Sequence, residues 1–487
     1  MSEIRVSTSA AVSAPPPFIS HRGRDRGLLA DFLGGQAGAQ GIVMVTVPAP
    51  LADPADLLAE DSGEGFVYLP PEGRQLAGLG RAAVLAARGE DRFAGLIRQA
   101  ALAPRARLLS LAPGTHRPLY FGGLAFAPGG ADEGPWAAFG DASFVLPRWL
   151  YSRQGGRASL GLAVAGRELE KAGQRESWLD QMACHWERLA RGQVRPPAEP
   201  SELALGAAGS SEMGEVARRI ERAIGEIAAG RFEKVVMALR LAAEGKAQLE
   251  PLGAFRRLRA LAAGGRQTAF LIRRGGAAFF GATPELLVSV SGTRLQSEAL
   301  AGTCRREESM ADLTTRSKNE HEHQIVAQAI VEALAPWCRR LEVAPTALRP
   351  LRGLSHWATG IAGELDEPRH LLEVAERLHP TPAVGGWPRQ AALDFLAGNE
   401  MEPRGWYAGP VGYFDDRGNG ELRVALRSAI TEGRRATLFA GAGIVAGSQA
   451  PGELAEMQAK AQPMLSALGI ARAADSVHEP FTRRHHD

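Results

Sequence analysis

Short apolar runs joined by tight turns fill the second half of this 487-residue chain, and they constrain its fold more than any other feature. Strand-like runs lie at 268–274, 277–283, 286–292 and 294–302, and a second series lies at 406–414, 421–430 and 436–445. The connections are too short for a crossover between parallel strands, so neighbouring runs are expected to pair antiparallel. We therefore predict an α+β fold, with large antiparallel β-sheets packed together and helices on the outside.

Composition indicates how the chain is divided. Ser, Ala and Pro dominate residues 1–20, and we predict that this segment and the end at 475–487 are disordered tails. Residues 21–200 mix strand-like runs with Ala- and Arg-rich helical stretches, and they form an N-terminal half of sheet and helices without a chemical motif. A polar, proline-containing stretch at 193–211 is a linker or a loop within one fold. The candidate functional residues lie beyond it, at 212–470.

Charge and cysteine content restrict the class of partner. Lys and Arg number 56 against 54 Asp and Glu, so the net charge of +2 gives no reason to expect nucleic acid or a membrane surface. The three cysteines, Cys184, Cys304 and Cys338, are odd in number and widely spaced, which supports neither a disulfide framework nor a zinc site. No run reaches the ~18 apolar residues of a membrane span, and the N-terminus lacks the apolar region of a signal peptide. We expect a cytoplasmic protein with a small-molecule partner.

Two predicted helices direct carboxylates toward their apolar faces. Glu322 precedes an apolar stripe by three and four residues, so it shares the buried face of its helix. Glu456 stands four residues before Lys460, beside the apolar stripe of the last helix. It forms either an ordinary i, i+4 ion pair or, together with Glu322, a site for a divalent cation such as magnesium. His321 and His323 are two residues apart, which does not suit a zinc site on a helix.

Two other ionisable residues lie in apolar surroundings. Lys234 is in a run that otherwise indicates a buried strand, so its ammonium group either reaches solvent at the strand end or is held inside, where it could serve as a base. Glu285 follows a proline at the edge of a glycine turn. It is either a solvated turn residue or a carboxyl group with a raised pKa that acts as a general acid. The residues by themselves leave both alternatives open.

Arg427 and Lys460 are cations next to apolar sequence. They either pair with structural acids or bind an anionic ligand, to which arginine offers a bidentate fork. The glycine-rich segment 441–448 would let backbone amides approach a ligand closely, although it lacks the lysine of a P-loop.

Taken together, these segments resemble the chorismate-utilising enzymes, a family that includes isochorismate synthase, salicylate synthase, the large component of anthranilate synthase and aminodeoxychorismate synthase. The matching stretches are, in chain order, FEKVVMA, GATPELLV, EALAGT, SKNEHEHQIV, LHPTPAVGG, RGWYAGPVGY, VALRSA and LFAGAGIVAGS followed by E-x-x-x-K. The resemblance implies the fold of that family, chorismate as the substrate and Mg²⁺ as the cofactor.

The resemblance also implies roles for single residues. Lys234 corresponds to the base that activates water, and Glu285 to the acid that faces the departing ring hydroxyl. Glu322 and Glu456 correspond to the magnesium ligands. The positions that the resemblance implies for substrate binding are Thr303, His379, Ala383, Tyr407, Arg427, Gly443 and Lys460.

Differences within the family favour one reaction. Members that add ammonia typically have glutamine at the position of Lys234, so the lysine favours water. Ala301 stands where aminodeoxychorismate synthases have a lysine, and no glutamine amidotransferase subunit is expected. Ala383 stands where salicylate synthases tend to have threonine. The resemblance therefore implies an isochorismate synthase, an isomerase, with salicylate synthase as the alternative. A non-catalytic protein on the same scaffold would be expected to lack one of the four catalytic and metal-binding residues, and all four are present.

One motif departs from the family pattern, and some properties are left open. Where the family usually has KVVLAR, this chain has KVVMALR, so Leu239 takes the place of the arginine and Arg240 follows one residue later. A shift of one residue in a strand moves the side chain to the opposite face. The N-terminal 200 residues match only loosely. The pathway is either menaquinone or siderophore biosynthesis, and we expect a monomer or a weak homodimer.

Overall fold

The structure, a computed structural model, describes residues 24–114, 116–192, 203–205, 208–262, 265–305, 313–351, 354–400 and 402–470. The tails predicted at 1–20 and 475–487 lie outside the described residues, as do residues 193–202 of the predicted linker.

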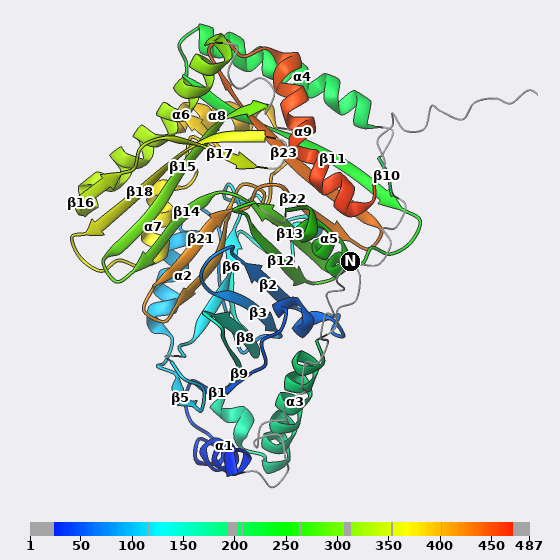
Figure 1. Cartoon of the computed structure of the whole chain (residues 1–487), viewed down its shortest axis with the longest axis vertical. Coiled ribbons are helices and arrows are strands. Elements are labelled where there is room, and N and C mark those ends of the chain that lie inside the picture. Colours follow the sequence, from blue (N-terminus) through cyan, green and yellow to red (C-terminus); the bar gives the residue numbers. More distant parts are fainter. Residues whose placement is uncertain are drawn as a thin grey trace, which may run out of the picture.

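Two large β-sheets form the centre of the molecule (Figure 1). Among the described residues the first sheet has 13 strands, and all its pairs are antiparallel except that of β1 with β5. Its strands follow one another in space as β10 (Leu203–Leu205), β11 (Lys234–Gly245), β23 (Arg435–Val445), β22 (Ser428–Glu432), β13 (Ala277–Thr283), β12 (Thr268–Arg274), β2 (Gly65–Leu69), β3 (Gln75–Leu79), β8 (Trp149–Gln154), β9 (Arg157–Ala165), β1 (Ile42–Pro48) and β5 (Arg107–Ser110), with β19 (Gly386–Trp387) paired to β11.

The second sheet has 10 strands in the described part of the chain. Their order is β16 (Cys338–Val343), β18 (Leu354–Leu365), β15 (Arg294–Arg305), β14 (Leu286–Ser291), β21 (Gly420–Val424), β20 (Pro410–Asp415), β6 (Leu119–Leu124), β7 (Ala142–Leu146) and β4 (Ala83–Ala87), with β17 (Ala347–Leu351) paired to β18. Strands from both halves of the sequence share each sheet, because β12 pairs with β2 in the first and β20 pairs with β6 in the second.

Helices cover the outside of the sheets. In Figure 1, α4, α6, α8 and α9 lie at the upper end of the molecule and α1 and α3 at the lower end. The α-helices are α1 (Arg24–Gly35), α2 (Arg92–Leu102), α3 (Ala172–Arg191), α4 (Ala208–Ala228), α5 (Pro251–Ala262), α6 (Leu313–Leu334), α7 (Leu371–Leu378), α8 (Arg389–Asn399) and α9 (Ala450–Leu468). Short 3₁₀ helices occur at Pro54–Leu58, Gly134–Trp136, Gly166–Leu169 and Ala335–Trp337. None of the described helices is both long and apolar enough to cross a membrane.

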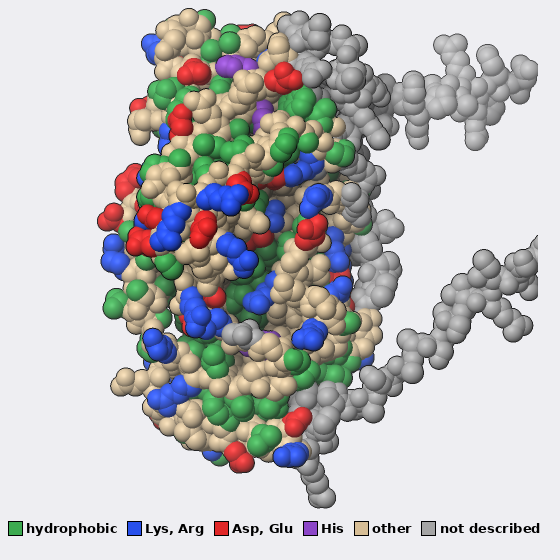
Figure 2. All heavy atoms as spheres, turned by 60° about the vertical axis from the view of Figure 1, so that its left-hand side comes forward, with side chains coloured by type: hydrophobic (Ala, Val, Ile, Leu, Met, Phe, Trp, Pro, Cys, Tyr) green, Lys and Arg blue, Asp and Glu red, His purple; other side chains and the backbone are tan. Residues whose placement is uncertain are grey.

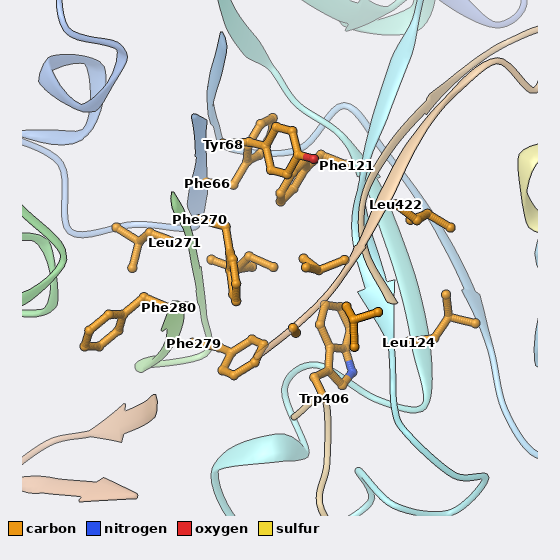
Figure 3. Packing of buried hydrophobic residues seen from close by; sticks show 14 of the residues in the cluster. Phe66, Tyr68, Phe121, Leu124, Phe270, Leu271, Phe279, Phe280, Trp406 and Leu422 are labelled. Carbon is orange, nitrogen blue, oxygen red and sulfur yellow. The ribbon is translucent and has the colours of Figure 1, made fainter. Parts of the chain in front are cut away.

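Aromatic side chains fill the space between the two sheets (Figure 3). Phe66 of the first sheet stacks on Phe121 of the second, with their ring centroids 4.0 Å apart. Tyr68 meets Tyr413 edge to face in the same layer, at 5.8 Å. Such pairs bury large apolar areas and fix the relative position of the sheets. Together with the antiparallel pairing, this packing confirms the predicted fold class.

Two of the places at which the chain passes from one sheet to the other lie next to each other. One crossing joins β13 to β14 through Glu285, and the other joins β21 to β22 through Arg427. The two crossings are hydrogen-bonded to each other: the backbone N–H of Ala282 donates to Arg427 O at 3.3 Å, and that of Val424 donates to Glu285 O at 3.2 Å. The topology therefore brings the turn of Glu285 and the turn of Arg427 together between the sheets.

Candidate active site

A cavity that is partly open to solvent, with about 710 Å³ of empty space including that solvent, lies where the two crossings meet. Eight of the residues predicted for the site line it: Glu285, Thr303, Glu322, Ala383, Tyr407, Arg427, Gly443 and Lys460. Its wall also includes Val236, Leu300, His356, Val384, Arg404 and Phe439. Residues predicted from seven separate motifs thus line one cavity.

Lys234 lies directly behind this wall. It begins β11, and its side chain is completely buried, so the alternative in which it reaches solvent does not describe this structure. Lys234 Nζ lies 3.0 Å from Glu322 Oε1 on α6. The neighbouring strand carries Gly443, opposite Val236 in the register, and a Cβ atom at Gly443 would overlap Glu322 Oε1. The missing side chain at 443 is what lets the carboxylate approach the lysine.

The charges around Glu322 favour its ionised form. Burial by itself would raise its pKa, but Lys234, Lys460 and Lys318 together hold the pKa below its ordinary value. Glu322 is therefore a carboxylate at neutral pH. It faces the cavity from a helix that packs on β15, the strand that carries Thr303.

Glu285 has the opposite surroundings. It is 3% exposed, and none of the described residues forms an ion pair or a hydrogen bond with its carboxyl group. Burial raises the pKa of Glu285 to about 8, and the negative charge of Glu298 adds to this, while Lys234 and Lys460 oppose it. At neutral pH Glu285 thus carries a proton that it can donate into the cavity.

Arg427, His356 and Thr303 form a chain of hydrogen bonds along the wall. Arg427 has a positive φ of 49°, and its Nη2 lies 3.1 Å from His356 Nε2. Burial, together with Lys460 and Arg427, holds the pKa of His356 well below its ordinary value, so its ring is neutral. Because arginine can only donate, His356 Nε2 accepts, and Nδ1 then donates to Thr303 Oγ1 at 3.2 Å. The Thr303 hydroxyl keeps its own hydrogen for a ligand.

The last helix contributes Lys460 and Glu456. Lys460 Nζ donates to Gly441 O at 3.0 Å and pairs with Glu456 Oε1 at 2.6 Å, so the ordinary i, i+4 pair is present. Glu456 is not among the residues that line the cavity. Nearby, the buried carboxylate of Glu453 pairs with Lys318. Three lysines therefore balance the three carboxylates Glu322, Glu453 and Glu456.

Of the two predicted magnesium ligands, Glu322 lines the cavity and Glu456 does not. The described part of the chain contains no cluster of three or more His, Cys, Asp or Glu side chains arranged to hold a metal. Magnesium does not require one, because it is usually bound by one or two carboxylates, with water and substrate oxygens completing its shell. Glu322, an ionised carboxylate that faces a cavity large enough for a small ligand, meets that requirement.

The structure does not bring every predicted residue to the cavity. Tyr407 lies in the wall, where its ring stacks on Phe439 with centroids 4.9 Å apart. His379 lies outside it: its Nε2 is 3.0 Å from Phe126 O, and its ring packs on Phe93 and Phe126. His379 follows the last residue of α7, and it does not line the cavity.

Sequence reasoning missed two polar residues of the wall, His356 and Arg404. His356 stands near the start of the long strand β18, and Arg404 precedes the glycine of the RGWY motif. Both are at least 94% buried, which for histidine and arginine is unusual. An ionisable residue inside a strand of apolar, small and hydroxyl-bearing residues, as in LSHWATGIA, is the one signal that the sequence offered for His356.

The surface around the left-hand side of Figure 1 is hollowed, with hydrophobic side chains in the depth of the hollow and Lys and Arg side chains around it (Figure 2). On this face the basic residues alternate with Asp and Glu, so no large patch of one charge forms. Such a face suits a small anionic molecule better than a nucleic acid.

Comparisons with known proteins agree with the geometry. The sequence matches the family described as "Chorismate binding enzyme" over residues 29–469. It is 37% identical over 372 residues to the salicylate biosynthesis isochorismate synthase of Pseudomonas aeruginosa, covering 74% of this chain and 76% of that one. It is 33% identical over 369 residues to the isochorismate synthase MenF of Bacillus subtilis, covering 73% and 75%.

A solved structure resembles the fold over most of its length. The menaquinone-specific isochorismate synthase MenF of Escherichia coli superposes with a TM-score of 0.68 and 25% identity, covering 91% of this chain and 99% of that one. The family match spans nearly the whole described chain, and the similarity to the relatives spans about three quarters of it. The chain therefore belongs to the family of chorismate binding enzymes.

Proposed function

We propose that this chain is a magnesium-dependent isochorismate synthase, an isomerase that converts chorismate to isochorismate. The observation that carries the proposal is that a protonated carboxyl group, Glu285, lines a cavity whose other wall includes Glu322, the partner of the buried Lys234. Relatives named isochorismate synthase, at 33% and 37% identity, favour the same reaction.

The reaction that we propose exchanges one hydroxyl group for another. Water adds at C2 of the ring, the two ring double bonds shift, and the C4 hydroxyl leaves as water after protonation. Lys234 first releases the proton of the ammonium group that pairs with Glu322, and as an amine it then takes the proton from the attacking water. Glu285 gives its proton to the departing hydroxyl. One water molecule enters and one leaves, so the reaction is reversible and needs no oxidant or reductant.

The anionic ends of chorismate need cations and donors. We assign Arg427, Tyr407 and Lys460 to the substrate carboxylates, with the hydroxyl of Thr303 and the backbone amide of Gly443 as further donors. Glu322 and Glu456 would hold the magnesium ion, which would orient a carboxylate of the ring and offset its charge. Enclosure in a low-dielectric cavity strengthens each of these interactions.

Salicylate synthase is the competing function, because it would make isochorismate first and then eliminate pyruvate. Ala383 in the cavity wall supports stopping at isochorismate, since salicylate synthases tend to carry threonine there. A cytoplasmic location, a monomer or weak homodimer, the absence of an amidotransferase subunit, and a place in menaquinone or siderophore biosynthesis stay predictions.

Product analysis tests the proposal directly. Purified protein is incubated with chorismate and Mg²⁺, and the products are separated by chromatography. We expect isochorismate in a reversible mixture with chorismate, reached from either side. Salicylate and pyruvate in equal amounts would reject isochorismate synthase in favour of the lyase, and unchanged chorismate would reject both.

Lys234→Ala tests the assignment of the base, and Lys171→Ala is its control. Removing the base should lower turnover by about 10²- to 10⁴-fold, the usual contribution of a positioned acid or base, while chorismate still binds. Lys171→Ala replaces a lysine at the exposed start of α3 and should leave the rate unchanged. A Lys234→Ala enzyme with full activity would contradict the assignment of the base.

A further inference from the structure

We propose that Arg404 is a positioning residue for the reaction, which holds the strand of Lys234, the segment of Ala383 and the turn of Tyr407 in one arrangement. This inference rests on the proposed function. It concerns a residue that lines the cavity but whose side chain is committed to the protein itself.

The contacts of Arg404 join four separate segments of the chain. Its side chain is 3% exposed. Nη1 donates to Val384 O at 2.8 Å, and Nη2 donates to Val236 O at 2.7 Å. Nε and Nη2 both bond the carboxylate of Glu400, at the end of α8, and the guanidinium carbon lies 4.2 Å from the ring centroid of Phe126.

Two of these contacts and one backbone bond of Arg404 bear on groups of the proposed site. Val236 is two residues beyond Lys234 on β11, and residues two apart in a strand point to the same face. Val384 directly follows Ala383, so a bond to its carbonyl oxygen fixes that wall. The backbone N–H of Tyr407 donates to Arg404 O at 3.1 Å, which places the tyrosine relative to the same residue. Without the bonds of Arg404, these three parts of the wall could therefore move relative to one another.

Arg404 is not suited to bind the substrate. A guanidinium has five N–H groups, and four of those of Arg404 point to Glu400 and the two carbonyl oxygens. Arg427 differs, because the one hydrogen bond of its side chain within the described chain goes to His356 and it forms no ion pair there. The two arginines of the cavity thus divide the work, with Arg427 available to an anion and Arg404 occupied by the backbone.

Arg404→Lys tests the positioning role, because a lysine keeps the charge but cannot reach two carbonyl groups and a carboxylate at once. We expect kcat to fall by about 10- to 100-fold, since small displacements of reacting groups cost that much. The KM for chorismate should stay within about threefold, because uniform binding is retained. A KM raised tenfold with kcat kept would show a substrate-binding role instead, and unchanged values of both would also overturn the proposal.

Arg389→Lys is the matched control. Arg389 also donates from its Nη2 to two backbone carbonyl oxygens, those of Arg377 and Leu378, at 2.8 and 3.0 Å, but it does not line the cavity. Thermal denaturation of both variants measures the loss of stability that each substitution causes. We expect similar losses of stability but a fall in kcat only for Arg404→Lys. An equal fall in kcat in both would mean that the effect is general, and would overturn the proposal.

Glu400→Gln covers the case in which Arg404→Lys does not fold. It leaves Arg404 in place but removes the charge that orients the guanidinium, so we expect a smaller fall in kcat with KM kept. If kcat is unchanged in Glu400→Gln, the positioning role is rejected. Wild-type protein that does not convert chorismate rejects the proposed function itself, whereas an active wild type with fully active variants rejects only the role of Arg404.

Discussion

Glu285 and Glu322 face one cavity from different elements, and their neighbours differ. Glu285 lies on the crossing between the sheets, where no described side chain pairs with it and Glu298 adds negative charge, so its pKa rises to about 8. Glu322 lies on α6 against the ammonium group of Lys234, and its pKa is held low. The same residue type is thus a protonated carboxyl group on one wall and a carboxylate on the other, and burial and the nearest charges decide which.

The largest effect should come from removing the acidic proton of Glu285. Glu285→Gln keeps the shape of the side chain but cannot protonate the leaving hydroxyl, so we expect turnover to fall by about 10²- to 10⁴-fold. Binding of chorismate, measured by calorimetry, should persist. A variant that retains more than about a tenth of the wild-type rate would contradict the assignment and make the two glutamates equivalent.

A smaller effect should come from displacing Glu322 by a substitution at its neighbour Gly443. In Gly443→Ala the new methyl group would overlap Glu322 Oε1 and lie 3.1 Å from Lys234 Cε, so the ion pair must shift. We expect turnover to fall by about tenfold or more, as for other small displacements in an active site. Steady-state kinetics with Mg²⁺ measures it.

Gly452→Ala is the control for that substitution. Gly452 lies on α9, and nothing stands within 4 Å of a Cβ atom built there. Its rate and stability should match those of the wild type. Equal rates in Gly443→Ala and Gly452→Ala would show that the close approach of Glu322 to β23 does not matter for the reaction.

The smallest effect concerns the pH dependence. Glu285 is protonated below its pKa of about 8, so the rate should fall as the pH rises through that value. Glu298→Gln removes a negative charge and frees Arg349, which pairs with Glu298; both changes favour the ionised form of Glu285. The falling limb of kcat should therefore move to lower pH. A limb that stays in place or moves to higher pH would show that Glu298 does not act on Glu285.

Local patterns predicted the strands, the antiparallel pairing and the inward face of α6, because each depends on residues close in sequence. The state of Glu285 could not be predicted locally. Its burial depends on the crossing between β13 and β14, which is completed by bonds to the β21–β22 crossing far along the chain. The burial of Lys234 could not be predicted locally either, because the local run allowed its side chain to reach solvent. Its partner Glu322 comes from α6, far along the chain.

Other parts of the wall escaped prediction for a different reason. Arg404 donates to two backbone carbonyl oxygens. Every residue has a backbone carbonyl group, so no sequence pattern predicts these hydrogen bonds. His379 belongs to a matching motif, but the packing of its ring on Phe93 and Phe126 depends on the N-terminal half, where the resemblance is loose. By contrast, the departure at Leu239 followed strand alternation: Leu239 is fully buried, whereas Arg240 pairs with Glu402 near the surface.

The sharing of each sheet by both halves of the sequence has a consequence for synthesis. Val67 of β2 pairs with Leu271, and Gly122 of β6 pairs with Gly412, so the first strands to leave the ribosome must wait for partners made much later. Until then their edges stay open, and closing such long loops is slow. A nascent chain that stops short of β20 leaves β6 without one of its neighbours. Activity can therefore appear only when translation is almost complete.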